Sequence, residues 1–200
     1  MSVSQLLDAL ASAEPTPGGG AASAIAGAMG ASLLIMVTGL AKSRNNTDEE
    51  KAALDDARDV LVPLTADLTR LADADAEAFN EVMAAYRLPK ASDEEKTARS
   101  RAIQQALRGA TVVPLDTLRA CADALAQAQA VAQPGNRTAA SDAGVAVALL
   151  RAAAAGAYAN VRINLESIKD GEFKSTTDAE AARLSSAAAA DASTAMQALT

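Results

Sequence analysis

Histidine and tryptophan are both absent from this 200-residue sequence, and cysteine occurs once, as Cys121. The lack of histidine excludes a His-ligated metal, and it leaves proton transfer to carboxylates, lysine, tyrosine, the cysteine or water. One cysteine cannot form an intrachain disulfide and leaves too few ligands for a zinc site. Aromatic residues make up only 2%, and the formal net charge is −7. Because phosphate binding needs clustered basic residues, we expect no nucleic-acid partner.

Alanine dominates the hydrophobic half of the composition. Alanine is the strongest helix former and β-branched residues are sparse, so the composition predicts an all-α bundle of long helices. The length suits a single domain over residues 1–200. Each alanine buries little area, which favours further burial in an oligomer. The first ten residues lack the basic start of a signal peptide, so we expect a cytoplasmic protein.

Prolines, glycines and capping boxes define the expected helices. They cover about 2–13, 19–43, 48–87, 93–132, 141–167 and 178–199. The capping boxes that mark helix starts are Thr47 with Glu50, Ser92 with Glu95, and Thr177 with Glu180. Pro63 and Pro114 should interrupt or kink the two longest helices. A polar loop over 170–177 is expected before the last helix.

Residues 18–41 carry no charge and exceed the roughly 18 residues that a membrane span needs. A membrane-associated helix is therefore one interpretation, and a buried helix is the other. Small residues at Gly20, Ala24 and Ala28 share a face, which suits close packing between helices. We favour the buried helix and expect no membrane association.

Three consecutive glycines, Gly18, Gly19 and Gly20, stand between Pro17 and the apolar run. Glycine lets another group approach the main chain closely. The N–H groups at the start of the following helix are free to meet a ligand oxygen or an anion. The segment therefore predicts a loop that contacts a ligand.

A carboxylate, Asp75, interrupts the apolar face of the helix that follows Pro63. The other residues of this face are Leu64, Leu68, Leu71, Phe79, Val82 and Tyr86. A carboxylate on such a face is costly to bury unless paired, and its pKa tends to rise. Asp75 is a catalytic candidate, and the alternatives are a wet edge of the bundle or a pair with an arginine.

Further polar candidates lie on the helix predicted from residue 141 and after the helix that ends near residue 87. Asp142, Asn160 and Asn164 share a face, and the two amides lie one turn apart. Paired amides can read the edge of a heterocycle, join two subunits, or face solvent. Ser141 and Asp142 also suit ordinary helix capping. Lys90 can complement a helix dipole or supply a cation to a site.

Taken in order, these positions resemble the cyclodeaminase/cyclohydrolase family that acts on tetrahydrofolate derivatives. The segments that carry the resemblance are Pro15-Thr16-Pro17-Gly18-Gly19-Gly20, Asp75-Ala76-Glu77-Ala78-Phe79, Tyr86-Arg87-Leu88-Pro89-Lys90, Val113-Pro114-Leu115, Gly135-Asn136, Ser141-Asp142-Ala143-Gly144-Val145 and Asn160-Val161-Arg162-Ile163-Asn164. Each segment is weak alone, and their order and spacing are specific together. The stretch Lys42-Ser43-Arg44-Asn45-Asn46 departs from relatives that are basic there.

The resemblance implies an all-helical homodimer that binds a folate between helices, without a metal or redox cofactor. The expected activity is hydrolysis of 5,10-methenyltetrahydrofolate to 10-formyltetrahydrofolate, and the lack of a fused formiminotransferase segment favours it. The alternatives are a formiminotetrahydrofolate cyclodeaminase and a non-catalytic folate-binding helical dimer. Our hypothesis assigns proton transfer to Asp75 or Asp142, with Lys90 as a cation or proton donor. The substrate would be bound by Gly18, Gly19, Gly20, Ser141, Asn160 and Asn164.

Overall fold

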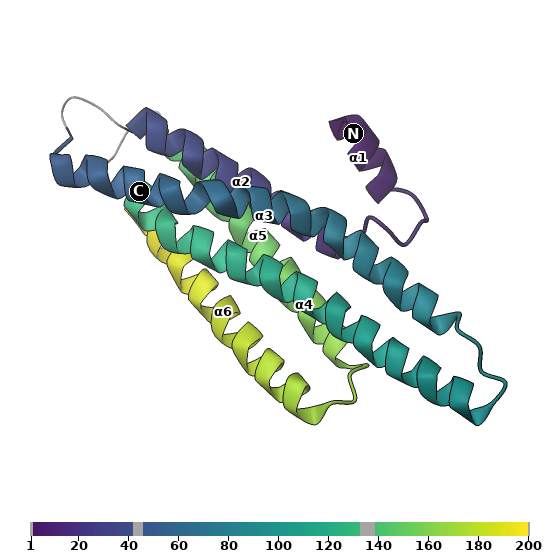
Figure 1. Ribbon diagram of the computed structural model, residues 1–200. Helices are drawn as coiled ribbons and strands as arrows, with labels where there is room; N and C mark the ends of the chain where they lie inside the picture. The colour runs from purple at the N-terminus through teal and green to yellow at the C-terminus, as the bar shows by residue number, and fades with distance from the viewer. Residues whose placement is uncertain (1, 42–45, 133–138, 200) are drawn as a thin grey trace.

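The computed structural model describes residues 2–41, 46–132 and 139–199, and over these ranges the chain is helical and contains no strand. The elements are α1 (Val3–Leu10), α2 (Gly19–Ala41), α3 (Asp48–Tyr86), α4 (Asp93–Ala132), α5 (Ala140–Leu165) and α6 (Gly171–Ala198). The prediction of an all-α bundle of long helices is confirmed. Figure 1 shows α3 and α4 running past the other helices to the turn that joins them.

Two of the three predicted capping boxes form as expected. Thr47 Oγ1 accepts from the Glu50 N–H at 3.1 Å, and Glu50 Oε2 accepts from the Thr47 N–H at 2.9 Å. The backbone N–H groups of Ser92 and Glu95 make the same reciprocal pair of bonds, each 3.2 Å long, at the start of α4. Local sequence therefore determines where the two longest helices begin.

The third capping box and the predicted loop over 170–177 are wrong. Helix α6 already begins at Gly171, where Asp170 Oδ1 accepts from the Phe173 N–H at 3.0 Å. Asp170 also pairs with Arg108 of α4, whose guanidinium lies 4.7 Å from the centre of the Phe173 ring. Contacts with α4 therefore start α6 about two turns early and leave Thr177 buried inside the helix.

Neither internal proline ends its helix, so of the two effects expected, an interruption or a kink, the interruption does not occur. Pro63 lies within α3 and Pro114 within α4, and both helices are continuous. A helix can retain a proline when packing against neighbouring helices outweighs one lost hydrogen bond. Pro63 is exposed, whereas Pro114 is buried, so the two prolines meet different surroundings.

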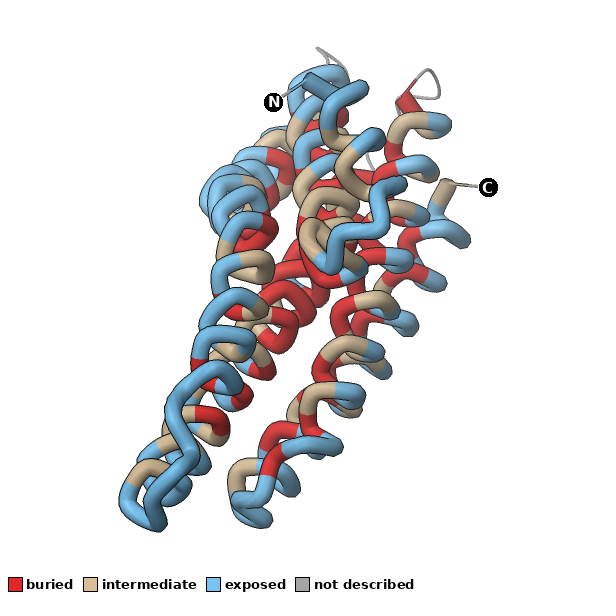
Figure 2. Tube along the Cα trace, turned by 90° about the vertical axis from the view of Figure 1, so that its right-hand side faces the viewer, coloured by how far each residue is buried: buried red, intermediate tan, exposed pale blue. Residues whose placement is uncertain are grey.

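Helix α2 lies antiparallel to α3 and α5 and packs closely against both. An added Cβ at Gly27 would lie 3.1 Å from Leu68 of α3, and one at Gly30 would lie 2.8 Å from the Ala146 carbonyl oxygen of α5. Glycine is needed at these positions because any side chain would force the helices apart. Figure 2 shows the buried residues along the inner faces of the helices, with exposed residues outside.

Helices α2 and α5 are long and apolar enough to cross a membrane by length and composition alone. Both belong to the core of the bundle. In the most apolar stretch of 18 residues, 44% of α2 and 39% of α5 is buried inside the bundle. The core helix of a bundle passes the same test, because it too must be apolar along its length.

Helix α1 lies apart from the bundle in Figure 1 and contains no buried residue. It carries a capping box of Ser2 with Gln5 that we did not predict. Among the predicted features, Lys42-Ser43-Arg44-Asn45 and Gly135-Asn136 lie outside the described residues.

Candidate functional site

Asp75 lies at the N-terminal end of α2, on the face of α3 that the apolar stripe defines. Its Oδ2 accepts a hydrogen bond from the Ala21 N–H at 2.9 Å, so it satisfies one of the free amides at the helix start. The side chain is half-buried, and desolvation raises the pKa of its carboxyl, while the Ala21 N–H opposes that shift. No arginine in the described residues pairs with it. Asp75 is thus a partly desolvated acid whose Oδ1 lies against Gly20 and accepts no hydrogen bond from the described residues.

The triple-glycine segment brings α2 into direct contact with Asp75. A Cβ on Gly20 would overlap the carboxylate of Asp75, so only glycine leaves room for the acid there. An added Cβ on Gly19 would lie 3.7 Å from Asn160 Nδ2, an ordinary contact, and one on Gly18 would lie 3.2 Å from the Pro15 carbonyl oxygen. The bend therefore gathers Asp75 of α3 and Asn160 of α5 around one helix terminus.

Ser23 and Gly156 support this bend, and sequence reasoning did not single them out. Ser23 is buried and its Oγ donates to the Gly19 carbonyl oxygen at 2.7 Å. A Cβ on Gly156 of α5 would overlap that hydroxyl, so the glycine allows α5 to approach the start of α2. The available signal was a serine inside an apolar helix and a glycine one turn before Asn160.

Both predicted asparagines are partly buried and hydrogen-bonded to main-chain carbonyls. Asn160 Nδ2 donates to the Gly156 carbonyl oxygen at 2.8 Å within α5. Asn164 Nδ2 donates to the Ala110 carbonyl oxygen of α4 at 2.7 Å. No described residue donates to either Oδ1 atom, so each amide retains a free acceptor oxygen for a ligand.

Three predicted site residues lie elsewhere in a single chain. Asp142 and Asn160 lie near opposite ends of α5, about 27 Å apart along the helix axis at 1.5 Å per residue. Because α5 runs antiparallel to α2, Asp142 is at the end of the bundle away from the glycine bend. Ser141 is its exposed neighbour at the same end of the bundle. Lys90 is exposed in the turn after α3, at the same end of the bundle as the start of α2. It is separate from the site because α3 runs about 17 Å past Asp75 to Tyr86, at 1.5 Å per residue, before that turn begins. The structure therefore gathers Asp75, the glycines and the amides, but not these three.

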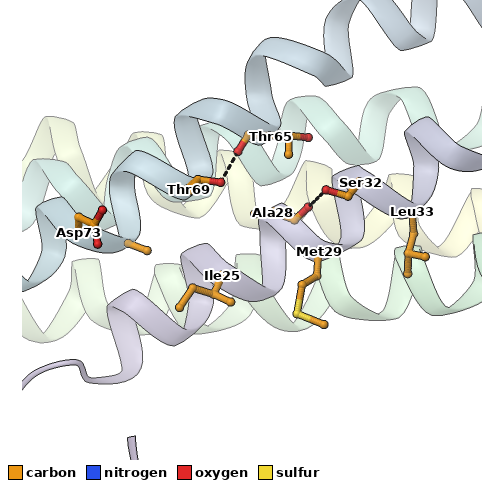
Figure 3. A pocket seen from close by; sticks show the side chains of 9 residues that line it. Ile25, Ala28, Met29, Ser32, Leu33, Thr65, Thr69 and Asp73 are labelled. Atoms are coloured by element: carbon orange, nitrogen blue, oxygen red, sulfur yellow. Dashed lines mark hydrogen bonds between the residues drawn. The ribbon is translucent and has the colours of Figure 1, made fainter. Parts of the chain in front are cut away.

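An apolar groove of about 550 Å³ lies between α2 and α3, and Figure 3 shows its lining. Ile25, Met29 and Leu33 of α2 and Thr65 and Thr69 of α3 line it, with Asp73 at one end. None of the predicted site residues lines this groove. Its apolar walls carry no group suited to proton transfer apart from the exposed Asp73, so the chemistry is better assigned to Asp75.

The described residues contain no group of three or more Cys, Asp or Glu side chains placed to bind a metal ion. The site so far consists of a carboxylate, a helix terminus and two amides. These groups can bind a polar heterocycle and exchange protons with it.

Comparison with known proteins gives three concordant matches. The sequence profile described as formiminotransferase-cyclodeaminase matches residues 2–183. The methenyltetrahydrofolate cyclohydrolase of Methylorubrum extorquens is 44% identical over 171 residues, which cover 86% of this chain and 82% of that enzyme. The formimidoyltransferase-cyclodeaminase of Rattus norvegicus is 39% identical, and the match covers 80% of this chain but 30% of the rat protein.

A solved structure supports the same relationship. The crystal structure of formiminotetrahydrofolate cyclodeaminase from Thermotoga maritima matches with a TM-score of 0.88 and 29% sequence identity. The match covers 100% of this chain and 96% of that chain, so every helix of the bundle, including α1, falls within it.

Proposed function

Since the chain belongs to the formiminotransferase-cyclodeaminase family, we propose that it hydrolyses 5,10-methenyltetrahydrofolate to 10-formyltetrahydrofolate. The observation that carries this choice is the 44% identity to a methenyltetrahydrofolate cyclohydrolase, over 82% of that enzyme's length. The site is consistent with it, because a half-buried carboxylate lies beside free backbone amides and two polar side chains.

The reaction needs one base and one acid. Water adds to the amidinium carbon that bridges N5 and N10, and a base accepts the proton that the water loses. The bond from that carbon to N5 then breaks as N5 gains a proton, so the carbon remains on N10 as a formyl group. One proton is released overall. The substrate is a cation, which a nearby carboxylate stabilises.

Asp75 is the side chain best placed for the base. Desolvation raises its pKa, which makes it a stronger proton acceptor than an exposed aspartate. Its Oδ2 is held by the Ala21 N–H, and Oδ1 accepts no hydrogen bond from the described residues. The Oδ1 of this fixed carboxylate can accept a hydrogen bond from the attacking water without first breaking one to the protein.

The glycine bend and the two asparagines would hold the pterin ring and its bridging carbon near Asp75. The N–H groups at the start of α2 can stabilise the oxygen that develops negative charge as water adds. No metal or redox cofactor is required for any of these steps.

The cyclodeaminase reaction is the second candidate, because the Thermotoga maritima structure that matches over this whole chain is a cyclodeaminase. In that reaction N10 attacks the formimino carbon on N5 and ammonia leaves. The same base would accept the N10 proton, so both reactions can use one site. Their products differ, and product assays separate them.

We also propose that the protein acts as a cytoplasmic homodimer. Ser141 and Asp142 lie too far from Asn160 in one chain to share its site, so any role for them requires a second copy. Exposed apolar side chains favour association: Leu7 of α1 is 59% exposed and Met29 of α2 is 54% exposed. Light scattering coupled to size exclusion tests the dimer, and a monomeric mass at assay concentration would remove Ser141 and Asp142 from the site.

The deciding experiment pairs two assays on wild type and Asp75→Asn. One follows the loss of methenyltetrahydrofolate absorbance, and the other measures ammonia release from formiminotetrahydrofolate. We expect the first activity in wild type and a decrease in kcat on the order of 10²-fold or more in the variant. Asp73→Asn is the matched control, because Asp73 is an exposed acid on the same helix and borders the apolar groove instead. Folate binding without turnover in wild type would favour the non-catalytic alternative.

A further inference from the structure

Pro114 of α4 leaves one main-chain carbonyl in the bundle without its helical partner. In an α-helix the N–H of each residue bonds the carbonyl four residues earlier, and proline has no N–H. The carbonyl affected by Pro114 is that of Ala110, and α4 continues on both sides of it. A carbonyl inside a packed bundle needs a donor from elsewhere.

The missing donor comes from α5. Asn164 Nδ2 donates to the Ala110 carbonyl oxygen at 2.7 Å, a short bond between two helices. A main-chain carbonyl only accepts hydrogen bonds, so the amino end of the Asn164 amide must face it. The Oδ1 atom is therefore directed away from Ala110, and it accepts no hydrogen bond from the described residues. The proline thus orients an amide on another helix.

Asn160, one turn earlier on the same helix, has the same arrangement. Its Nδ2 donates to the Gly156 carbonyl oxygen at 2.8 Å, and its Oδ1 has no partner among the described residues. Both amides thus keep their acceptor ends free, at side chains that lie about 5–6 Å apart for this spacing. Asn160 also borders Gly19 of the glycine bend, and the next residue, Gly20, lies against Asp75.

We propose that Pro114 is a positioning residue for substrate recognition: it frees the Ala110 carbonyl to orient Asn164, whose Oδ1 accepts a hydrogen bond from an N–H donor of the substrate ring. Asn160 presents a second acceptor beside it. This inference rests on the proposed function, which makes the substrate a folate. The pyrimidine edge of its pterin ring carries such donors, in the amino group and the ring N–H. A ring without N–H donors on that edge would bind weakly.

The kinetic test compares KM and kcat for methenyltetrahydrofolate in wild type, Pro114→Ala, Asn164→Leu and the double variant. Asn164→Leu removes the acceptor and should raise KM by about tenfold, the effect of one lost hydrogen bond. Pro114→Ala restores the helical donor to Ala110 and should raise KM by about three- to tenfold. Because the amide binds the ground state and transition state alike, kcat should change little. Asn164→Leu should raise KM by a smaller factor in the Pro114→Ala background than in wild type, because both substitutions act through one amide.

Pro63→Ala is the matched control. It also restores a helical N–H in place of an internal proline, but on the exposed side of α3. It should leave KM and kcat at wild-type values. Melting temperatures of all variants separate recognition from folding, and Pro114→Ala is expected to melt no lower than wild type, because alanine is the better helix former.

Two further probes make the result independent of turnover. Side-chain amide hydrogens of ¹⁵N-labelled protein without ligand should exchange faster at Asn164 in Pro114→Ala than in wild type. Tetrahydrofolate should bind wild type about tenfold more tightly than its 2-desamino-2-methyl analogue, and this preference should shrink in Asn164→Leu.

The proposal fails if Asn164→Leu or Pro114→Ala keeps the wild-type KM, or if the two effects on KM add fully. An unchanged amide exchange rate in Pro114→Ala would also refute the orienting role. The failure of the proposed function would look different. Wild type would then turn over neither folate substrate, while the exchange measurement would still judge the pairing of Pro114 with Asn164.

Discussion

Gly20→Ala places a methyl group where the structure holds the carboxylate of Asp75. An ideal Cβ at position 20 would overlap both carboxylate oxygens, and the α-helical backbone of α2 gives the methyl group no other direction. The atoms in conflict belong to a short side chain and not to a backbone, so the carboxylate can rotate away. We therefore expect the variant to fold while losing the bond between Ala21 and Asp75.

The expected magnitudes for stability and for activity differ widely. A hydrogen bond to a charged group contributes about 1.5–3 kcal/mol when well buried, and less here because Asp75 is only half-buried. Alanine in place of glycine in a helix returns about 0.5–1 kcal/mol. The net loss should be about 1 kcal/mol, or about 2–4 °C in Tm for a chain of this size. Displacing a catalytic group by about 1 Å can cost 10²-fold in rate. Activity should therefore fall far more than stability.

The assay is the loss of methenyltetrahydrofolate absorbance, read beside thermal melting of the same sample. Gly39→Ala is the matched control, because position 39 also lies within α2 and an added Cβ there meets no atom within 4 Å. The control should be as active as wild type and more stable by about 0.5–1 kcal/mol. If Gly20→Ala retained activity within about threefold of wild type, Asp75 would not need its observed position, and its assignment as the base would be refuted.

Three further predictions concern stability. Asp75→Asn should be at least as stable as wild type at neutral pH, because desolvation disfavours the ionised acid and raises its pKa. As pH falls through that raised pKa towards 3.8, the folded wild type becomes protonated and gains stability, so the melting temperatures of the two proteins should converge. Gly30→Ala should lower the free energy of unfolding by about 1–3 kcal/mol in denaturant titrations, because its Cβ would lie 2.8 Å from the Ala146 carbonyl oxygen; an unchanged midpoint would contradict that contact. Glu180→Gln should lower the free energy of unfolding by about 0.5–1 kcal/mol at neutral pH, because Arg119 forms a bidentate ion pair with Glu180 and lowers its pKa. The difference in stability between variant and wild type should vanish as pH falls through that lowered pKa. A difference that stays constant with pH would rule out the ion pair as its cause.

The candidate site was partly visible in the sequence because two of its signals are local. Asp75 stood out as the one carboxylate on an apolar helical face. The three glycines stood out because three consecutive glycines directly precede an apolar helix. Neither signal revealed that they touch. The contact arises because α2 and α3 are antiparallel and offset so that Gly20 lies level with Asp75.

Other parts of the site had no local signal. Pro114 looked like a helix breaker, and its effect on Asn164 depends on which carbonyl it frees and on which helix lies beside that carbonyl. The interlock of Ser23 with Gly156 depends in the same way on the close approach of α2 and α5. Such pairings join residues separated by 50 or more positions, and no helical periodicity reports on them.

Helix content, most helix boundaries and the all-α class could be read from the chain alone, since alanine content, capping boxes and apolar periodicity act within a few residues. The start of α6 could not, because Asp170 caps that helix while contacting Arg108 of α4. The same holds for which polar residues meet: antiparallel packing brings Asn160 to Gly19 and leaves Asp142 at the opposite end of α5. Short-range energies decide where helices form, whereas the approach of their faces decides which side chains share a site.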